Sequence, residues 1–228
     1  MKRILAAIIA AALLLSGCTS ASRPAESAPP TGTPSPSPTP IVTPTPEPEP
    51  ADGELVLVRD YIPGIFIDFI DLKYATTDNF TGRVIYDSDE AYLRYGTVKK
   101  LLCAQNELSG RGLSLKIWDA YRPVSAQFKL WEICPNPVYV SDPNNGYSKH
   151  SRANTVDITL VTDTGESISM PSGFDDFTSL ADRDYSDVSA EAAENARLLE
   201  NVMVENGFVP YSGEWWHYSD SVAYDVYG

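Results

Sequence analysis

A proline-rich stretch near the N-terminus limits what this chain of 228 residues can fold into. From Thr19 to about Asp52 the sequence is mostly Pro, Thr, Ser and Glu, as in PTGTPSPSPTPIVTPTPEPEP. Such a segment has almost no apolar side chains to bury, so nothing offsets the entropy cost of ordering it. Dense proline favours extended polyproline II instead. We therefore expect a stalk here and one compact domain with a sizeable core in residues 54–228.

The segment before the stalk has the pattern of an export signal. Lys2 and Arg3 precede an apolar run that ends in small residues before Cys18. This pattern predicts a secretory signal peptide over residues 1–17, too short and wrongly flanked for a membrane span. The LSGC ending resembles a bacterial lipobox, whose cysteine is lipidated, and cleavage without lipidation is the alternative. We expect an exported protein, lipid-anchored through Cys18 to the outer face of the bacterial cell membrane, with residues 18–53 as its stalk.

The net charge limits the kind of partner, and the cysteine spacing limits the kind of metal site. The formal net charge of −14 argues against nucleic acid. After Cys18 only Cys103 and Cys134 remain, and neither stands in a Cys-x-x-Cys spacing typical of a metal site. An exported protein can pair two such cysteines, and two buried free thiols are the alternative. The sequence leaves both open.

The domain combines strand and helix patterns without regular βαβ alternation. Period-two alternation and turn residues predict strands over residues 54–62, 65–74, 155–162, 208–211 and 214–220. A strand running into a loop is expected over 113–122, and a turn with a short strand over 79–86. Helices are expected over residues 87–112, 124–133 and 190–207. Pro123 suits the first turn of the second helix, and Ser189 caps the third. We therefore predict an α+β fold, a central and mostly antiparallel sheet flanked by helices.

The chain has only two histidines, and each stands near a carboxylate. His150 lies in YSKHSRANTVDITL, where Asp157 follows at the start of an expected strand, and His217 closes EWWH after Glu214. In an ideal strand Glu214 and His217 would face opposite sides. Both can serve one site only if a bulge or a sharp entry at Gly213 turns one of them. Ordinary core and surface roles for these residues are the alternative.

Two histidines and one carboxylate form the ligand set of a catalytic zinc site, with a fourth position open for water. Any such site in a monomer must use both His150 and His217. Zinc lowers the pKa of bound water to about 7 and polarises a carbonyl group. Glu214, close to one ligand, would then act as general base. The sequence thus favours one zinc ion per domain.

A cationic residue adds to this set. Hydrolysis of an amide passes through an oxyanion, which a guanidinium group can stabilise. Arg122, in WDAYRP, stands just before Pro123 at a strand-to-helix junction, where functional residues often lie. A structural salt bridge to Asp119 is the alternative, and the residues alone do not decide between them.

At these residues the sequence resembles the VanX-type D-alanyl-D-alanine dipeptidases, zinc peptidases related in fold to D,D-carboxypeptidases and the hedgehog signalling domain. SKHSRANTVD meets the family pattern Ser-x-His-x-x-Gly-x-Ala-x-Asp, except that Ala153 replaces the glycine and Thr155 the alanine. EWWHY matches a second signature, DAYRP the segment of the catalytic arginine, and YATTDNFTG an N-terminal signature. MPSGFDDF resembles the stretch after the zinc aspartate. The matches extend over most of residues 54–218.

The resemblance assigns a role to each of the residues singled out above. It implies a zinc ion held by His150, Asp157 and His217, with Glu214 as general base and Arg122 at the oxyanion. It further implies that Asp175 contacts the substrate amino group, with the adjacent Asp176 as the alternative, and that Ser148 contacts substrate. A Cβ atom at Ala153 and a β-branched Thr155 are expected to shift the ligand loop or narrow the pocket.

Three functions follow from this resemblance. The leading one is zinc-dependent hydrolysis of D-alanyl-D-alanine, or a similar small D,D-dipeptide, at the cell envelope. Export motivates a second, a D,D-carboxypeptidase that trims peptidoglycan stem peptides, because a tethered enzyme outside the membrane meets the cell wall. The third is a non-catalytic wall-binding module, against which the complete set of site residues argues. The expected partners are the peptide and, through the lipid anchor only, the membrane.

Overall fold

The computed structural model describes residues 48–63 and 69–228. The predicted signal peptide, the lipidation site Cys18 and most of the stalk lie outside the described residues. The described residues form one unit by their internal contacts. Within the described ranges, no helix has the length and apolar character needed to cross a membrane.

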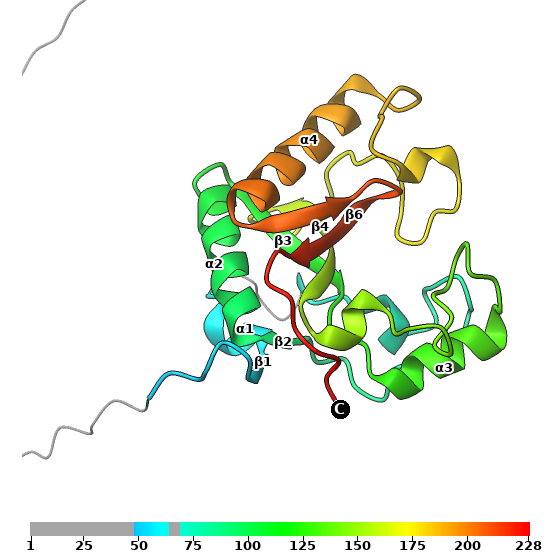
Figure 1. The fold of residues 1–228 in the computed structure, drawn as a ribbon. Helices are drawn as coiled ribbons and strands as arrows, with labels where there is room; N and C mark the ends of the chain where they lie inside the picture. The colour runs from blue at the N-terminus through cyan, green and yellow to red at the C-terminus, as the bar shows by residue number, and fades with distance from the viewer. Residues whose placement is uncertain (1–47, 64–68) are drawn as a thin grey trace, which may run out of the picture. The chain divides into compact units, whose positions relative to one another are not determined.

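The central element is a four-stranded antiparallel sheet, which Figure 1 shows beside its helices. Its strands follow the order β3 (Leu113–Asp119), β4 (Thr155–Thr162), β6 (Glu214–Asp220) and β5 (Phe208–Tyr211). A two-stranded sheet joins β1 (Leu55–Leu57) to β2 (Tyr92–Arg94). The helices are α1 (Val58–Tyr61), α2 (Tyr95–Ser109), α3 (Val124–Ile133) and α4 (Ala190–Glu205), with short 3-10 turns η2 (Lys73–Ala75), η3 (Lys149–Arg152) and η4 (Ser179–Ala181). The architecture is α+β, as predicted.

Helices α2 and α4 pack against the four-stranded sheet and against each other, whereas α3 lies apart from them (Figure 1). Apolar side chains recur at helical spacing along the buried side of α2, as at Val98, Leu101 and Leu108. Strand β4 is buried at every position except its last. Side chains alternate along a strand, so Asp157 faces away from its core neighbours Val156 and Ile158. The layering thus gives a carboxylate a buried position on the face opposite these two.

The elements predicted from residue 113 onward are confirmed, within a few residues at their ends. The Ser189 side chain accepts a hydrogen bond from the Ala192 N–H at 3.1 Å and caps α4, as the sequence indicated. Gly207, with φ +85°, ends the same helix region, and Gly165, with φ +86°, forms the turn after β4. The local signals were strong here because capping and turn chemistry coincide with the apolar pattern.

The first part of the domain differs from the prediction. The strand expected over 54–62 ends at Leu57 and continues as the helical turn α1. The helix expected over 87–112 begins only at Tyr95, because residues 92–94 pair with β1. The strand expected over 65–74 lies partly outside the described residues, and the rest forms one bridge and the turn η2.

Two further expectations are corrected. The last residues of 79–86 form no strand, although the N–H groups of Ile85 and Tyr86 both donate to the Tyr74 carbonyl. Pairing with a distant segment overrides local propensity in these places. Cys103 is exposed and Cys134 half-buried, and both are free, so neither the disulfide nor a pair of buried thiols is formed.

Candidate active site

Two carboxylates and one imidazole lie side by side on three neighbouring strands of the sheet. In the strand register Asp119 on β3 is opposite Asp157 on β4, and Asp157 is opposite His217 on β6. An irregularity between Ile117 and Asp119 brings Asp119 into this alignment. Directly opposite residues in antiparallel strands have Cα atoms about 4.5–5.5 Å apart. Strand pairing alone therefore brings residues distant in sequence to one place.

Of the two arrangements that the sequence allowed, a bulge or a sharp entry at Gly213, β6 shows a bulge. Pro210 pairs with Tyr218 and the next residue, Tyr211, pairs with Glu214, so β6 contains extra residues between these pairs. Extra residues in one strand reorient its side chains. As a result Glu214 Oε2 lies 3.4 Å from His217 Nδ1, although an ideal strand would separate them. Both side chains therefore face one site.

His150 reaches the same place from the turn η3, just before β4. The Ser148 side chain caps this turn by accepting a hydrogen bond from the His150 N–H at 3.3 Å. His150 Nδ1 lies 2.8 Å from the Ala120 carbonyl oxygen, to which its N–H donates. Such a bond fixes the tautomer and leaves the other ring nitrogen as the acceptor. That atom, Nε2, lies 3.2 Å from Asp157 Oδ2 and 3.4 Å from His217 Nδ1.

The three side chains can hold one metal ion. One ligand atom from each of His150, Asp157 and His217 lies within 4.8 Å of the other two. His150 and Asp157 are buried, and the His217 side chain is 12% exposed. Two imidazole nitrogens and a carboxylate oxygen match the donor types that zinc prefers, and three protein ligands leave a position open. The residues present therefore fit zinc.

The buried charges change one another's pKa values. Burial favours protonated Asp157, but His150 and His217 outweigh it and hold its pKa far below the ordinary value. Burial lowers the pKa of His150, but Asp157 and Asp119 outweigh it and raise that pKa. Burial is also the first cause of the raised pKa of Glu214, reinforced by Asp157 and opposed by His217. A carboxyl with a raised pKa is a better proton acceptor, as a general base requires.

Arg122 makes the salt bridge that the sequence left open. It donates from Nη2 to Asp119 Oδ2 at 2.6 Å, from Nη1 to Gln127 Oε1 at 2.9 Å and from Nε to Tyr86 Oη at 3.3 Å. Its guanidinium carbon lies over the Tyr74 ring, 5.0 Å from the ring centroid. Each terminal nitrogen also carries a second N–H. A salt bridge and an electrophilic role are therefore compatible.

The positive charge of Arg122 acts on the proposed metal site, because it lowers the pKa values of both His150 and Glu214. The part played by Tyr86 was not foreseen: its hydroxyl donates to Asp119 Oδ1 at 2.5 Å. No local sequence signal marks that contact, which joins residues 33 positions apart.

Asp175 lies on a loop and has a left-handed backbone conformation, with φ +53°. It interacts electrostatically with Asp157 and Glu214. The Tyr74 hydroxyl donates to Asp175 Oδ2 at 2.7 Å. Burial, helped by the charges of Asp157 and Glu214, raises the pKa of Asp175 to about 7. Asp176 instead accepts a hydrogen bond from the Thr178 N–H at 2.8 Å within its own turn. Of the two neighbouring carboxylates, Asp175 is the one directed to the site.

The two departures from the family pattern leave the ligands in place. Ala153, with φ +59°, adopts the left-handed conformation that suits glycine and ends η3. Thr155 is fully buried, and its hydroxyl pairs with that of Ser219, opposite it on β6, at 3.0 Å. The turn still delivers His150 to the other ligands.

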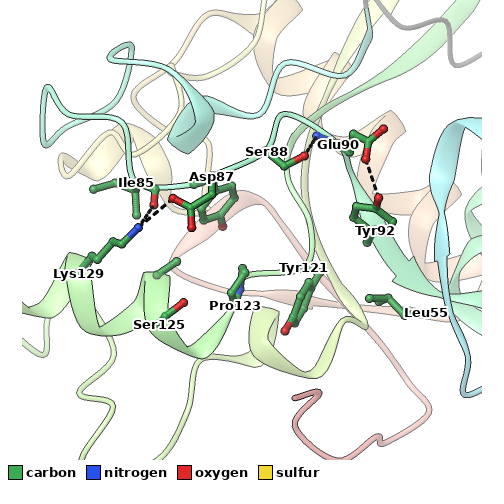
Figure 2. A pocket seen from close by; sticks show the side chains of 12 residues that line it. Leu55, Ile85, Asp87, Ser88, Glu90, Tyr92, Tyr121, Pro123, Ser125 and Lys129 are labelled. Atoms are coloured by element: carbon green, nitrogen blue, oxygen red, sulfur yellow. Dashed lines mark hydrogen bonds and ion pairs between the residues drawn. The ribbon is translucent and has the colours of Figure 1, made fainter.

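A separate cavity of about 260 Å³ lies beside Tyr121 and Pro123 (Figure 2). Tyr86 also lines it. At its rim Lys129 Nζ donates to the Ile85 carbonyl oxygen at 3.1 Å. None of the three ligands and not Glu214 is among its lining residues. The candidate site is therefore distinct from this cavity, although Tyr86 belongs to both surroundings.

Comparison with known proteins agrees with this geometry. A family model described as D-ala-D-ala dipeptidase, of the M15 peptidases, matches residues 53–225. The chain belongs to this family. Its members are zinc-dependent metallopeptidases, and the resemblance inferred from the motifs is confirmed.

Several relatives carry the name D-alanyl-D-alanine dipeptidase. The one from Escherichia coli K12 is 40% identical over 155 residues, covering 68% of this chain and 80% of the relative. The one from Streptomyces coelicolor is 36% identical over 191 residues, covering 73% and 91%. The one from Enterococcus faecium is 36% identical over 168 residues, covering 65% and 83%. A solved structure, VanYB in complex with D-Alanine-D-Alanine, is 17% identical with a TM-score of 0.41 and covers 59% of this chain and 75% of its own.

Proposed function

We propose that the chain is a zinc-dependent D-alanyl-D-alanine dipeptidase. The observation that carries the proposal is the meeting of His150, Asp157 and His217 within 4.8 Å of one another, in a member of the dipeptidase family. One zinc ion per domain would be held by His150 Nε2, an Asp157 oxygen and His217 Nδ1. When bound in such a set, zinc lowers the pKa of a water molecule and polarises a substrate carbonyl.

Glu214 supplies the proton transfers. It accepts a proton from the attacking water and returns it to the leaving amine as the peptide bond breaks. Its carboxylate lies 3.4 Å from His217 Nδ1, beside the proposed ion. Burial raises the pKa of Glu214, and this makes its carboxylate a stronger base. These features support Glu214 as the general base.

Arg122 stabilises the charge that develops on the scissile carbonyl oxygen. A donor is most effective when it is already held in place before the charge develops. Asp119, Gln127 and Tyr86 hold each nitrogen of the guanidinium, so little reorganisation is needed. In this role the salt bridge to Asp119 is a support for the cation.

Asp175 binds the free amino group of the substrate, and this contact favours a dipeptidase over a carboxypeptidase. An ammonium ion would pair with a half-buried carboxylate that Tyr74 already orients. The peptide chain of a longer substrate would carry a neutral amide there instead, which offers no charge to Asp175. Ser148, which caps the His150 turn, is proposed as an additional substrate contact.

We also propose that the enzyme acts outside the cell membrane. Residues 1–17 would be removed as a signal peptide, Cys18 lipidated, and residues 18–53 would form a stalk for the domain at 54–228. Peptidoglycan stem peptides would then be nearby, and trimming them as a D,D-carboxypeptidase is the second candidate function. Metabolic labelling with a radioactive fatty acid tests the anchor: the native chain should be labelled and a Cys18→Ala variant should not.

The experiment for the proposed function measures release of D-alanine from D-alanyl-D-alanine by the purified protein. Zinc-dependent release that a chelator stops and added zinc restores is expected, with L-alanyl-L-alanine as the control substrate. A pentapeptide ending in D-Ala-D-Ala separates the candidates, because a strict dipeptidase leaves it intact. No zinc-dependent release from either substrate contradicts the proposal.

A further inference from the structure

The residues after β6 lie along the turn that carries His150. We name residues 222–227 the tail segment, drawn in red below β6 in Figure 1. The Tyr227 N–H donates to the Ser151 carbonyl at 2.9 Å, and Arg152 Nη1 donates to the Tyr224 carbonyl at 2.9 Å. Asn154 Nδ2 donates to the Val222 carbonyl, also at 2.9 Å. The tail segment is thus bonded to residues 151–154, which directly follow His150.

Arg94, the last residue of β2, joins this pair of segments to a third. Its Nε donates to the Arg152 carbonyl at 3.0 Å, its Nη2 to the Asp225 carbonyl at 2.8 Å, and its Nη1 to the Gly53 carbonyl at 2.6 Å. The guanidinium also lies over the ring of Tyr227, with 4.7 Å to the centroid. All three side-chain nitrogens therefore bind backbone oxygens from separate parts of the chain.

The turn held by Arg94 is strained. Ala153 has φ +59°, a conformation in which a Cβ atom is unfavourable. Such conformations persist where surrounding contacts over-determine them. Here the Ala153 carbonyl accepts the Arg94 backbone N–H at 2.8 Å, while the Ala153 N–H donates to the His150 carbonyl at 3.0 Å. Arg94 thus contacts the turn through both its backbone and its side chain.

The three proposed ligands differ in how they are supported. Asp157 and His217 lie opposite each other on paired strands, whereas His150 is on the short turn η3. Metal affinity depends on holding each ligand close to its productive position. We infer that Arg94, together with the tail segment, is a positioning element for His150 as a metal ligand. This inference deepens the proposed function and rests on it for the identity of the ion.

The chemistry of arginine suits this role. A guanidinium presents donors in a rigid plane, whereas an ammonium is a point charge on a flexible stem. Arg94→Lys keeps the charge and loses the fork, so it should recover only part of the positioning. Arg94 touches none of the three ligand side chains among its hydrogen bonds, so its effect on the ion acts through residues 152 and 153.

The test measures zinc affinity of the full chain by competition with a chromophoric chelator. Loss of a group that orients a metal ligand lowers affinity about 10- to 100-fold. We expect a loss in that range for Arg94→Ala and a smaller loss for Arg94→Lys. Adding Ala153→Gly, which relieves the strain, should recover at least about threefold in the Arg94→Ala background. Lys99→Ala is the matched control, because this cation on α2 pairs with Asp52 at 2.6 Å and should change affinity less than about twofold.

Hydrogen exchange of residues 149–154 in the metal-free protein provides a second measurement. Faster exchange there in Arg94→Ala than in Lys99→Ala supports positioning, even if the wild-type protein binds no zinc, a result that would count against the proposed function alone. Equal exchange in the two variants overturns the inference. Where the wild type binds zinc, an equal zinc affinity of Arg94→Ala overturns it as well, as does a loss that Ala153→Gly leaves unchanged.

Discussion

The metal side and the substrate side of the candidate site are built in different ways. Asp157 and His217 lie opposite each other on hydrogen-bonded strands of the central sheet. Asp175 lies on a loop, with φ +53° and a hydrogen bond from Tyr74. On one side of it the Phe174 ring packs against buried Trp216, with centroids 6.2 Å apart. Two of the proposed metal ligands are therefore held by a rigid sheet, whereas the proposed substrate contact Asp175 is held by the packing of a loop.

The outer part of the Asp175 loop is held by aromatic rings near the surface. The centroid of the Phe177 ring lies 5.3 Å from that of Phe80 and 4.4 Å from that of Tyr139. Phe177 is 45% exposed. Loops on a rigid scaffold are where binding specificity is usually set. The comparison teaches that changes on the loop should alter substrate binding and leave the metal in place, whereas changes of the strand ligands Asp157 and His217 should remove the metal.

The largest expected effect is on catalysis with metal binding retained. Glu214→Gln should lower kcat by about 10²–10⁴-fold, because it removes the proton acceptor, while zinc affinity changes only a few-fold. Steady-state kinetics and chelator competition measure both. Glu166→Gln, at an exposed position, is the control and should match the wild type. Unchanged turnover in Glu214→Gln would remove Glu214 from the mechanism.

The next effect separates the substrate side from the metal side. Asp175→Asn should raise KM for D-alanyl-D-alanine about 10- to 100-fold, the size of a lost charged hydrogen bond, with zinc affinity unchanged. An N-acetylated dipeptide, which has no ammonium group, should be affected much less. Asp176→Asn is the matched control because its carboxylate serves its own turn. Equal KM values for the two variants would assign the amino-group contact elsewhere.

The same substitution should change the dependence of stability on pH. Asp175 has a folded-state pKa raised to about 7, so between pH 4 and 7 the native state of the metal-free protein binds more protons than the unfolded state. Its contribution to stability therefore falls as pH rises through this window. The gain in unfolding free energy from Asp175→Asn should be about 2 kcal/mol larger at pH 8 than at pH 5. Urea unfolding at both values measures it, and an equal gain would contradict the raised pKa.

A smaller effect is expected from the exposed rings. Phe177→Ala removes two aromatic contacts, each worth about 0.5–1.5 kcal/mol, and should raise KM for the dipeptide a few-fold by loosening the Asp175 loop. Zinc affinity should not change. Phe128→Ala, an exposed phenylalanine on α3, is the control. A loss of zinc affinity in Phe177→Ala would show that the two sides are not independent.

The smallest effect concerns the turn that joins the metal side to its support. Ala153→Gly should stabilise the protein by about 0.5–1 kcal/mol, because glycine adopts positive φ without the Cβ penalty. Thermal or urea unfolding measures the change. The contrasting variant is Ala196→Gly inside α4, which should destabilise the protein. A destabilised Ala153→Gly variant would mean that the Cβ atom makes a compensating contact.

The sequence predicted the metal side better than its surroundings. His150 and Asp157 are close in the sequence, and their loop-then-strand pattern is local. The bulge at Glu214–His217 was foreseeable as a condition, because strand alternation forbids the pair without it. The register that brings Asp157 beside His217 could not be read from local pattern, since it depends on which strands are neighbours.

What the sequence could not show was contact between distant segments. Arg94 meets Asp225 across 131 positions, and nothing in the local pattern of β2 indicates it. The acidic residues before Tyr92 resembled a helix start, but the strand pairing of β1 with β2 delays α2. Local chemistry therefore identified the reacting groups, and tertiary pairing determined their support.

Zinc content tests the central claim most directly. The full chain, stripped with a chelator, exposed to zinc and dialysed, is examined by elemental analysis beside Asp157→Ala and His217→Ala. One zinc ion per wild-type chain, and far less in both variants, is the expected result. A wild-type chain that retains no zinc, or variants that retain as much as the wild type, would contradict a metal centre built from His150, Asp157 and His217.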